Sequence, residues 1–569
     1  MKRLFKNKLV PIHRARLDEI HFGKQQDVDR PTLVNIYSLI ILGICAVFIL
    51  RLFHLTVVKG EYYRRLSEEN RIREIVIEPK RGKIIDRKGF VVAENKEGDN
   101  KLTSGRITSA RFYSAPEETA HLVGYRQIAD AGEIKKDICI NHLDLADKTG
   151  KRGVERMYEC QLRGRNGKKL IEVDAGGKYI NTVAIIPPQN GETIQLAMDL
   201  ELQKTTFELI KGKRAAVIVL DPQTGKVLAL TSSPSFNIQQ FESADPSIES
   251  YFTDKEKPLF NRATEGTYPP GSIFKLVVAT GALESGKITE KTLIEDTGQI
   301  TAGPLKFGNW YFLQYGRTEG MVDFVKALQR SNDIYFYKAG EALGPEGIRD
   351  WSEKFGLGVR IPFVFEQSEG LIPSAFWKEE VLSEKWYLGD TYNFSIGQGY
   401  VLVTPLQMAL SSSVFANNGY LCTPQLLRDK PSSCIKLPIS QKTIELVRTG
   451  MKKACETGGT GWPLFEFKVQ NLDLRMKRLS ETPDDKKASV EAQMERDPLY
   501  WRKIETGCKT GTAESHAKSG VSHAWFTIFA PFDNPEIAVT VLIEEGGQGS
   551  DVAAPIARDI LKAYFERRE

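Results

Sequence analysis

The sequence shows few of the features that mark a metal centre or a nucleic-acid-binding surface. Its 569 residues include only seven cysteines, and these lack the close spacing that holds zinc or an iron–sulfur cluster. The 78 lysine and arginine residues are nearly balanced by 73 aspartate and glutamate residues, and they gather in no single basic cluster. The composition therefore argues against a cysteine-bound metal and against a nucleic acid as the partner.

Long hydrophobic runs are also scarce, with one exception close to the N-terminus. The twenty residues between Arg30 and Arg51 carry no charge, and at about 1.5 Å per residue a helix of this length spans the apolar core of a bilayer. The segment 1–30 has eight basic and four acidic residues, which predicts a cytoplasmic N-terminus and an extracytoplasmic remainder. A signal peptide is the competing interpretation, but no small-residue cleavage pattern follows Leu50. We predict an uncleaved transmembrane helix over 31–52.

Six of the seven cysteines follow this helix and would lie on the extracytoplasmic side. Cys139 with Cys160, and Cys422 with Cys434, are compatible with disulfide bonds. A domain with a large core does not need such cross-links, so we expect buried free thiols instead. Cys508, which stands on a predicted strand directly before a lysine, is interpreted as a packing residue.

Three short sequence blocks, taken together, indicate a catalytic site. Each alone occurs by chance in a chain of this length, so their order and spacing carry the argument. The blocks are Ser272-Ile273-Phe274-Lys275, Ser331-Asn332-Asp333 and Lys509-Thr510-Gly511-Thr512.

The first block predicts a nucleophile and its base. A helix places Ser272 and Lys275, three residues apart, on one face. Two prolines and a glycine at 269–271 predict that this helix starts just before Ser272, which then lies near the positive end of the helix dipole. Lys275 can take the serine proton if burial, or the charge of Lys509, lowers the pKa of its amine.

The other two blocks predict groups that hold the substrate and move a proton. On a strand, the hydroxyls of Thr510 and Thr512 can bind a substrate carboxylate, while Gly511 lets a substrate backbone approach closely. The backbone N–H groups of Ser272 and Thr512 would form an oxyanion hole. We expect Ser331 to pass a proton to the leaving group.

Apolar periodicity predicts the fold around these blocks. Helical spacing over 553–565 predicts a helix that packs on one side of a sheet, and helices at Ser272 and over 404–415 would cover the other side. The expected fold class is therefore α/β with an antiparallel sheet. The strands are predicted within 215–230 as a hairpin, and over 509–513, 524–531 and 537–544.

The set of blocks resembles the active site of penicillin-binding proteins and serine β-lactamases. Further blocks narrow the resemblance to the class B transpeptidases, and among them to the penicillin-binding protein 2 group of cell elongation. The upstream blocks resemble the signature of that family's non-catalytic pedestal. The blocks are Asn261-Arg262-Ala263, Ile334-Tyr335-Phe336-Tyr337, Ser395-Ile396-Gly397-Gln398-Gly399-Tyr400 and Thr404 to Ala409, and upstream Arg81 to Gly89, Gly153-Val154-Glu155 and Leu162-Arg163-Gly164.

The resemblance implies a membrane-anchored enzyme that cross-links peptidoglycan stem peptides through an acyl-enzyme on Ser272, with a possible D,D-carboxypeptidase side activity. It implies that Lys509 and Thr510 hold the terminal carboxylate, that β-lactams acylate Ser272, and that no metal or cofactor takes part. It also implies that no glycosyltransferase domain is present, so that glycan polymerisation falls to a SEDS-family membrane partner and other elongation proteins. The expected location is the bacterial inner membrane, with a reduced pedestal over 53–189 and a transpeptidase domain over 190–569.

Three departures from the family pattern accompany this resemblance. The second block ends in Asp333, where many relatives have asparagine, although the penicillin-binding protein 2 group often has aspartate. The stretch between Asn95 and Arg111 is short, and 471–503 forms a densely charged insertion that we predict to be helical or disordered.

Three alternatives stay open at this point. A division-specific class B transpeptidase would be distinguished by its location at the septum. A β-lactamase or β-lactam sensor would turn over or report a β-lactam, although the pedestal signature is not expected in it. An inactive scaffold is disfavoured by the intact Ser272, Lys275, Lys509 and Thr510.

Overall fold

A computed structural model describes residues 31–96, 101–103, 106–108, 110–174, 176–363, 366–515 and 519–567. The predicted cytoplasmic segment 1–30 lies outside the described residues, as does part of the short stretch between Asn95 and Arg111. The chain divides into two compact units, Met1–Glu74 with Leu170–Ala184, and Ile75–Lys169 with Ile185–Glu569. Each unit is described by itself.

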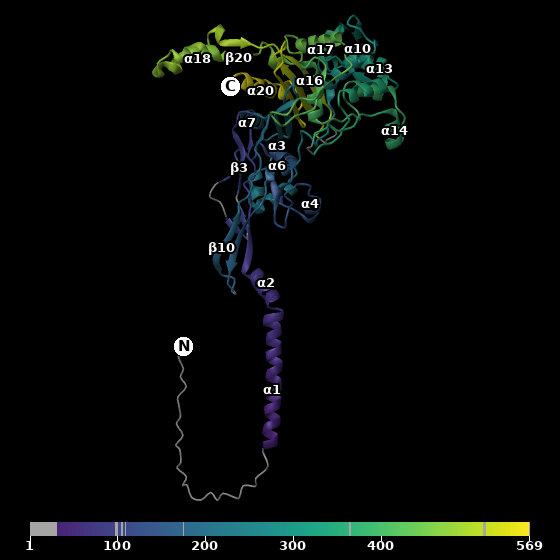
Figure 1. Ribbon diagram of the computed structural model, residues 1–569. Coiled ribbons are helices and arrows are strands. Elements are labelled where there is room, and N and C mark those ends of the chain that lie inside the picture. The colour runs from purple at the N-terminus through teal and green to yellow at the C-terminus, as the bar shows by residue number, and fades with distance from the viewer. Residues whose placement is uncertain are drawn as a thin grey trace, which may run out of the picture. The chain divides into compact units, whose positions relative to one another are not determined.

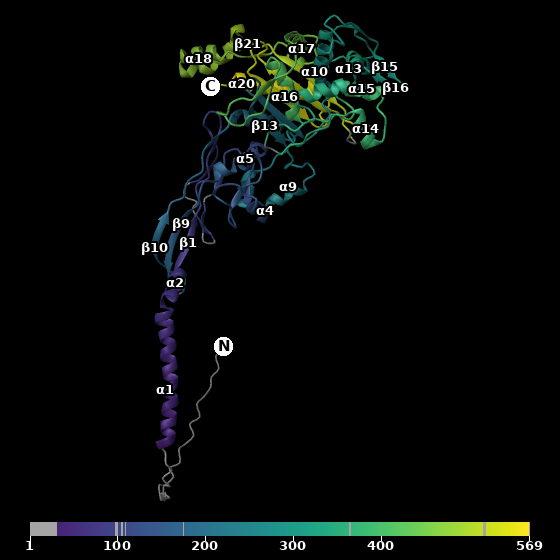
Figure 2. The ribbon, with the colours of Figure 1, turned by 45° about the vertical axis from the view of Figure 1, so that its right-hand side comes forward.

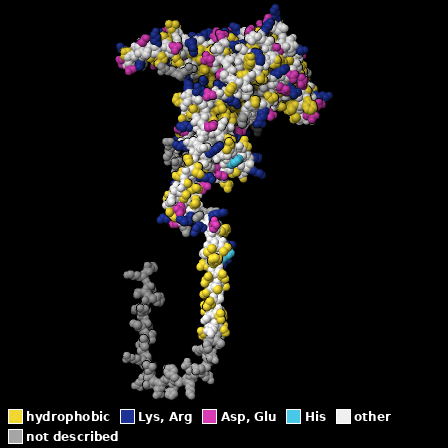
Figure 3. All heavy atoms as spheres, in the orientation of Figure 1, with side chains coloured by type: hydrophobic (Ala, Val, Ile, Leu, Met, Phe, Trp, Pro, Cys, Tyr) yellow, Lys and Arg dark blue, Asp and Glu magenta, His cyan; other side chains and the backbone are white. Residues whose placement is uncertain are grey.

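The first unit contains the apolar helix that the sequence predicts. Helix α1 (Pro31–Phe53) continues through a π-helical turn at His54–Val58, and α2 (Gly60–Arg71) follows. The segment Val34–Val58 is long and apolar enough to cross a membrane, and none of it is buried within the protein. Figure 3 shows this helix as a rod of apolar side chains almost without charge. It is a candidate membrane span.

The remainder of the first unit is the turn end of a hairpin, in which Glu172 forms an ion pair with Arg71. The hairpin strands, β9 (Gly167–Val173) and β10 (Tyr179–Ile186), are neighbours, and β9 also neighbours β1 (Ile72–Ile77). Within the second unit, Val76 and Ile77 at the end of β1 pair in parallel with β5 (Arg106–Thr108), which is antiparallel to β4 (Lys101–Thr103).

In the second unit, the first two of the three upstream sequence blocks meet at a buried group of charges. Arg81 donates to Glu155 and Glu159 at 2.6 Å each, and Arg111 donates to Glu155 at 2.9 Å. Asn95 pairs directly with Arg111 across β3 and β6, so the short connection leaves the sheet intact. The elements here are β2 (Ile84–Ile85), β3 (Val91–Asn95), β6 (Arg111–Tyr113), α3 (Ala120–Val123), β7 (Arg126–Ile128), α4 (Ala131–Lys135), β8 (Lys148–Gly150), α5 (Gly153–Met157), α6 (Glu159–Arg163) and β11 (Ile194–Gln195).

The larger part of the second unit is built on one antiparallel sheet, as predicted. Its order is β13-β12-β24-β23-β22, and every neighbouring pair is antiparallel. Successive residues of the central strands face opposite buried layers, because helices cover both sides of the sheet. The strands are β12 (Ala215–Asp221), β13 (Lys226–Ser233), β22 (Gly507–Ala513), β23 (His523–Ala530) and β24 (Ile537–Ile543).

Helices α7 (Leu200–Ile210) and α20 (Ala554–Phe565) share a core with one face of this sheet. On the other face lie α10 (Lys275–Glu284) and α16 (Pro405–Ala416), which begins at a capping box between Thr404 and Gln407. In Figures 1 and 2, α16 and α20 lie on opposite sides of the C-terminal strands. The predicted fold class is confirmed.

Helices α12 (Phe324–Arg330), α13 (Asp333–Lys354), α15 (Leu388–Ser395) and α17 (Gln441–Ala454) surround α10 and complete this layer. Shorter elements connect them. These are α8 (Ile238–Ser243), α9 (Glu249–Thr253), β14 (Ile294–Asp296), β15 (Gln299–Ala302), β16 (Leu305–Gly308), α11 (Trp310–Tyr315), β17 (Gly320–Val322), α14 (Ala375–Leu382), β18 (Tyr420–Cys422) and β19 (Cys434–Lys436).

The charged insertion forms a helical hairpin between two paired strands, β20 (Lys468–Gln470) and β21 (Trp501–Lys503). Its helices are α18 (Leu472–Ser480) and α19 (Lys487–Met494). Arg475 binds Glu491 at 2.7 Å, which ties the two helices together. Of the two predicted states, helical and disordered, the structure has the helical one.

The expectation of free thiols after the apolar helix is wrong. Cys139 is bonded to Cys160, and Cys422 to Cys434. A third disulfide joins Cys455 at the end of α17 to Cys508 on β22, so Cys508 is more than a packing residue. The 53-residue separation of this last pair gives no local signal in the sequence.

Candidate active site

The structure brings the three sequence blocks together around one cleft of about 480 Å³. Ser272, Ser331, Asp333, Thr510 and Thr512 all line it. Lys275 and Lys509 lie fully buried behind this lining, and Gly511 is buried on β22 between the two threonines. Residues separated by more than two hundred positions therefore share one site.

Ser272 lies in a 3₁₀ turn, Gly271–Phe274, that leads directly into α10. The turn is anchored on both sides, because Gly271 N donates to Gly397 O at 2.8 Å and Trp525 Nε1 donates to Pro269 O at 2.9 Å. Gly271 has φ +55°, and a Cβ there would lie 2.7 Å from Thr512 O. Only glycine therefore lets the serine turn approach strand β22 this closely.

A hydrogen-bonded chain connects the two buried lysines through Ser331. Lys275 Nζ donates to Asp333 Oδ1 at 2.6 Å, to Ser331 O at 2.8 Å and to Ser331 Oγ at 3.3 Å. Lys509 Nζ donates to the same Ser331 Oγ at 2.8 Å and to Thr510 O at 2.9 Å. The Ser331 hydroxyl thus lies between two amines, a position in which it can pass a proton from one to the other.

Burial lowers the pKa of both lysines below the usual value. For Lys275 this lowering is opposed by the negative charge of Asp333. For Lys509 the pKa is lowered well below its usual value by burial and, in addition, by the positive charge of Lys275. The sequence offered two causes for a lowered pKa of Lys275, burial and the charge of Lys509, and burial is the dominant one.

Asp333 has two partners, which fix its carboxylate. Oδ1 accepts from Lys275, and Oδ2 accepts from Trp310 N at 2.9 Å. Asn332 caps α13 by accepting from Tyr335 N at 2.9 Å. Asp333 therefore forms an ion pair with Lys275, the candidate base.

We expect Asp333→Asn to move the acid limb of the pH profile for acylation to lower pH. As the candidate base, Lys275 can accept a proton only when it is neutral. Asp333 raises the pKa of Lys275, so the removal of this charge lowers that pKa further. The measurement is the acylation rate constant for benzylpenicillin between pH 5 and 9. Asp551→Asn is the control, since Asp551 lines the same cleft but does not contact Lys275. An acid limb that stayed in place or rose would contradict this role.

Sequence reasoning missed two polar side chains at the cleft. Gln398 Nε2 donates to Thr512 O at 3.2 Å, and Gln398 Oε1 accepts from Glu514 N at 3.2 Å. Thr460 accepts from Thr510 Oγ1 at 2.8 Å. Gln398 lies in a block that supported the family resemblance, whereas Thr460 stands in no block that was singled out.

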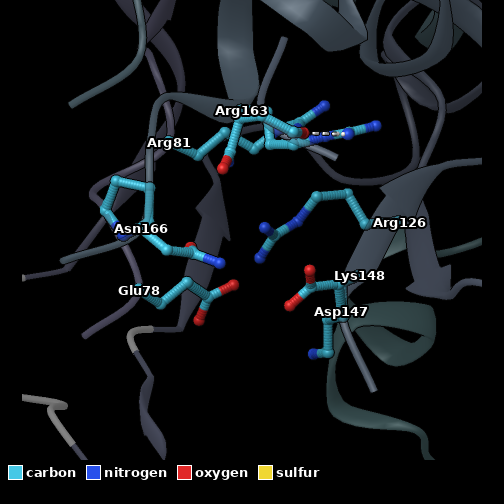
Figure 4. Close-up of a pocket in the computed structure, with 9 residues that line it drawn as sticks. Glu78, Arg81, Arg126, Asp147, Lys148, Arg163 and Asn166 are labelled. Carbon is cyan, nitrogen blue, oxygen red and sulfur yellow. Dashed lines mark hydrogen bonds between the residues drawn. The ribbon is translucent and has the colours of Figure 1, made fainter. Parts of the chain in front are cut away.

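A second, much smaller pocket lies among the charged residues upstream. Figure 4 shows the Arg126 guanidinium and the Glu78 carboxylate pointing into it. Its volume is about 20 Å³, enough for roughly one water molecule. Within the described part of the chain, no group of three or more His, Cys, Asp or Glu side chains is arranged to hold a metal ion. The cleft at Ser272 is therefore the candidate site.

The site combines an antiparallel sheet, a serine turn and two buried lysines with a hydroxyl between the lysines. This combination is typical of the serine acyl-transfer enzymes that include penicillin-binding proteins and β-lactamases. The comparison with family models narrows this class. Residues 215–478 and 479–562 match the penicillin-binding protein transpeptidase domain, and 104–196 match the penicillin-binding protein dimerisation domain. The chain belongs to the penicillin-binding protein family, within which it is a peptidoglycan D,D-transpeptidase of the penicillin-binding protein 2 group.

Individual relatives agree with this placement. The peptidoglycan D,D-transpeptidase MrdA of Haemophilus influenzae is 29% identical, over 95% of this chain and 92% of the relative. The penicillin-binding protein 2 of Helicobacter pylori, solved in complex with MreC, is 26% identical with a TM-score of 0.69, over 87% of this chain and 99% of that one. A chain of a peptidoglycan synthase complex that coordinates polymerization and crosslinking is 25% identical with a TM-score of 0.69, over 94% and 99%. The activity is the transpeptidation of cell elongation.

Proposed function

We propose that Ser272 is the nucleophile of this transpeptidase and that neutral Lys275 is its base. Ser272 Oγ attacks the carbonyl carbon of the D-Ala-D-Ala bond, and its proton passes to Lys275 Nζ. The N–H groups of Ser272 and Thr512 stabilise the oxyanion that forms. The observation that carries this proposal is the chain Asp333–Lys275–Ser331–Lys509 beside the serine turn.

Cleavage of the C–N bond then releases D-alanine, whose amine takes the proton that Ser331 relays from the lysines. Lys509 supplies positive charge and Thr510 a hydroxyl for the terminal carboxylate of the donor. Gly511 lets β22 pack closely against the serine turn, since a Cβ there would lie 3.2 Å from Pro270 O. The acyl group passes from Ser272 to an acceptor amine, whose proton is taken by Lys275. Lys275 returns a proton to Ser272 Oγ as the ester C–O bond breaks, which regenerates the enzyme. Water in place of the amine gives the carboxypeptidase side reaction. A β-lactam also acylates Ser272, but its ring opens and the leaving nitrogen stays attached to the acyl group.

The location and domain limits belong to the same proposal. Helix α1 crosses the inner membrane, 1–30 lies in the cytoplasm, and the rest is extracytoplasmic, as the charges before the helix favour. The pedestal covers 53–189 and the transpeptidase domain 190–569, with the insertion at 471–503. Three disulfides after α1 support an oxidising compartment.

The proposed partners are a SEDS-family membrane glycosyltransferase and an elongation protein of the MreC kind. The relative from H. pylori was solved with MreC, and another relative belongs to a synthase complex that couples polymerization to crosslinking. This chain matches these two relatives along nearly their whole length, which supports assigning partners of the same kinds to it.

The function is tested by measuring D-alanine released from a stem pentapeptide in the presence of an acceptor amine, for the wild type and for Ser272→Ala. We expect release and a cross-linked product from the wild type only. Release that persists in Ser272→Ala would contradict the assignment of the nucleophile.

A further inference from the structure

The end of the cleft that is proposed to bind the substrate carboxylate contains a hydroxyl from outside the three blocks. Thr510 Oγ1 donates to Thr460 Oγ1 at 2.8 Å, and both side chains line the cleft. A hydroxyl offers one proton and accepts through its lone pairs. The Thr460 proton is not used in this bond, so the Thr460 hydroxyl is a second donor for a ligand, and the Thr510 hydroxyl can turn from Thr460 toward the ligand when one binds.

The segment that carries Thr460 is held by backbone bonds on two sides. Thr460 N donates to Gln329 O at 3.3 Å, and Arg330 Nη1 donates to Gly458 O at 2.9 Å. Gly461 N donates to Ala454 O at 2.8 Å, which turns the chain back onto the end of α17. The backbone at Thr460 is therefore held next to the residues that directly precede Ser331.

A disulfide fixes this segment against the strand that carries Lys509. Cys455 begins the segment, and its partner Cys508 immediately precedes Lys509 on β22. Both cysteines are buried, and a Cβ on Gly461 would lie 2.7 Å from Cys508 Sγ. The chain therefore folds closely over the disulfide, which joins the two segments that contribute Thr460 and Thr510.

We propose that Thr460 is a further substrate-binding residue, which donates a hydrogen bond to the terminal carboxylate of the donor, and that the Cys455–Cys508 disulfide positions it. The proposal rests on the proposed function and extends its carboxylate subsite. A donor to an ionised carboxylate forms a stronger bond than one to a neutral carbonyl. Thr460 should therefore favour ligands with a free carboxylate over ligands in which that group is esterified.

The test compares acylation by benzylpenicillin with acylation by its methyl ester, using the full-length protein. We expect Thr460→Val to lower the rate constant for the free acid by about tenfold or more, the effect of losing a hydrogen bond to a charged group. The rate constant for the ester should stay close to that of the wild type. Thr460→Ser, which keeps the hydroxyl, should retain the wild-type ratio of the two rate constants.

Ser550→Ala is the matched control, since Ser550 is another hydroxyl that lines the cleft and its bond goes to Asp551. It should leave the ratio unchanged. Equal losses for acid and ester in Thr460→Val, or no loss for either, would overturn the proposal while the acyl transfer itself persists. If neither compound acylates the wild type, the proposed function fails and this proposal fails with it.

The disulfide is tested by the double variant Cys455→Ser/Cys508→Ser. We expect it to lower the ratio of acid to ester rate constants, as Thr460→Val does. The control is Cys422→Ser/Cys434→Ser, which removes a disulfide of the β18–β19 hairpin. An unchanged ratio in the first double variant, or an equal decrease in both, would overturn the positioning role.

Discussion

Lys275→Met is expected to lower the rate constant for acylation of Ser272 by about 10²–10⁴-fold, the usual contribution of a positioned general base. Methionine fills the buried space of the lysine stem but cannot accept the serine proton. Asp333 and Ser331 lose their contacts with the amine, whereas the anchors of the serine turn at Gly397 and Trp525 stay in place. The measurement is the acylation rate constant for benzylpenicillin at neutral pH.

Lys326→Met is the control for this variant, because the Lys326 amine donates to the backbone oxygens of Glu319 and Met321 and this residue is not among those that line the cleft. We expect acylation by this control at close to the wild-type rate. Near wild-type acylation by Lys275→Met would show that another group takes the proton, and Lys509 is the nearest amine to Ser331.

The second large effect concerns the stability of the upstream charge group. Glu155→Gln is expected to destabilise this region by about 3–5 kcal/mol, because it leaves Arg81 and Arg111 buried without their shared carboxylate. The measurement is hydrogen exchange of peptides covering β2, β3 and α5, as a function of urea. All seven tryptophans lie downstream of this region, from Trp310 to Trp525, so their fluorescence does not report on it.

Glu94→Gln is the matched control, since Glu94 forms a partly exposed pair with Lys83 in the same region. Such a pair contributes about 0–1 kcal/mol. If both variants destabilised the region equally, the buried group would not be the stabilising feature that its contacts indicate.

The same carboxylate predicts a pH dependence of stability. Burial alone would raise the pKa of Glu155, but Arg111 and Arg81 outweigh it and lower the pKa to about 2. Its stabilising contribution is therefore fully present above its ordinary pKa of 4.5 and is lost as the pH falls from there toward 2.

The sequence predicted those parts of the fold whose signal is local. The strands of the central sheet are apolar runs bounded by turns, and α16 and α20 start and stop close to the predicted residues. The helix at Ser272 follows from the prolines and glycine before it. In each case the pattern of neighbouring residues is enough, because periodicity and turn residues act within a few positions.

Contacts between distant segments could not be predicted in the same way. The third disulfide joins residues 53 positions apart, and Arg81 meets Glu155 across 74 positions. Thr460 becomes part of the cleft only because its segment folds back over Cys508. The sequence assigned the hydroxyls of Thr510 and Thr512 to a substrate carboxylate. It could not show that Thr460 lies beside Thr510, because that contact depends on tertiary packing.

The central claim is that Ser272 is acylated, and the most direct measurement is labelling of the folded, full-length protein with a fluorescent penicillin, followed by mass spectrometry of its peptides. We expect one label per chain, on the peptide that contains Ser272, and no label on Ser272→Ala. A label on another residue, or a folded wild type that takes no label at all, would contradict it.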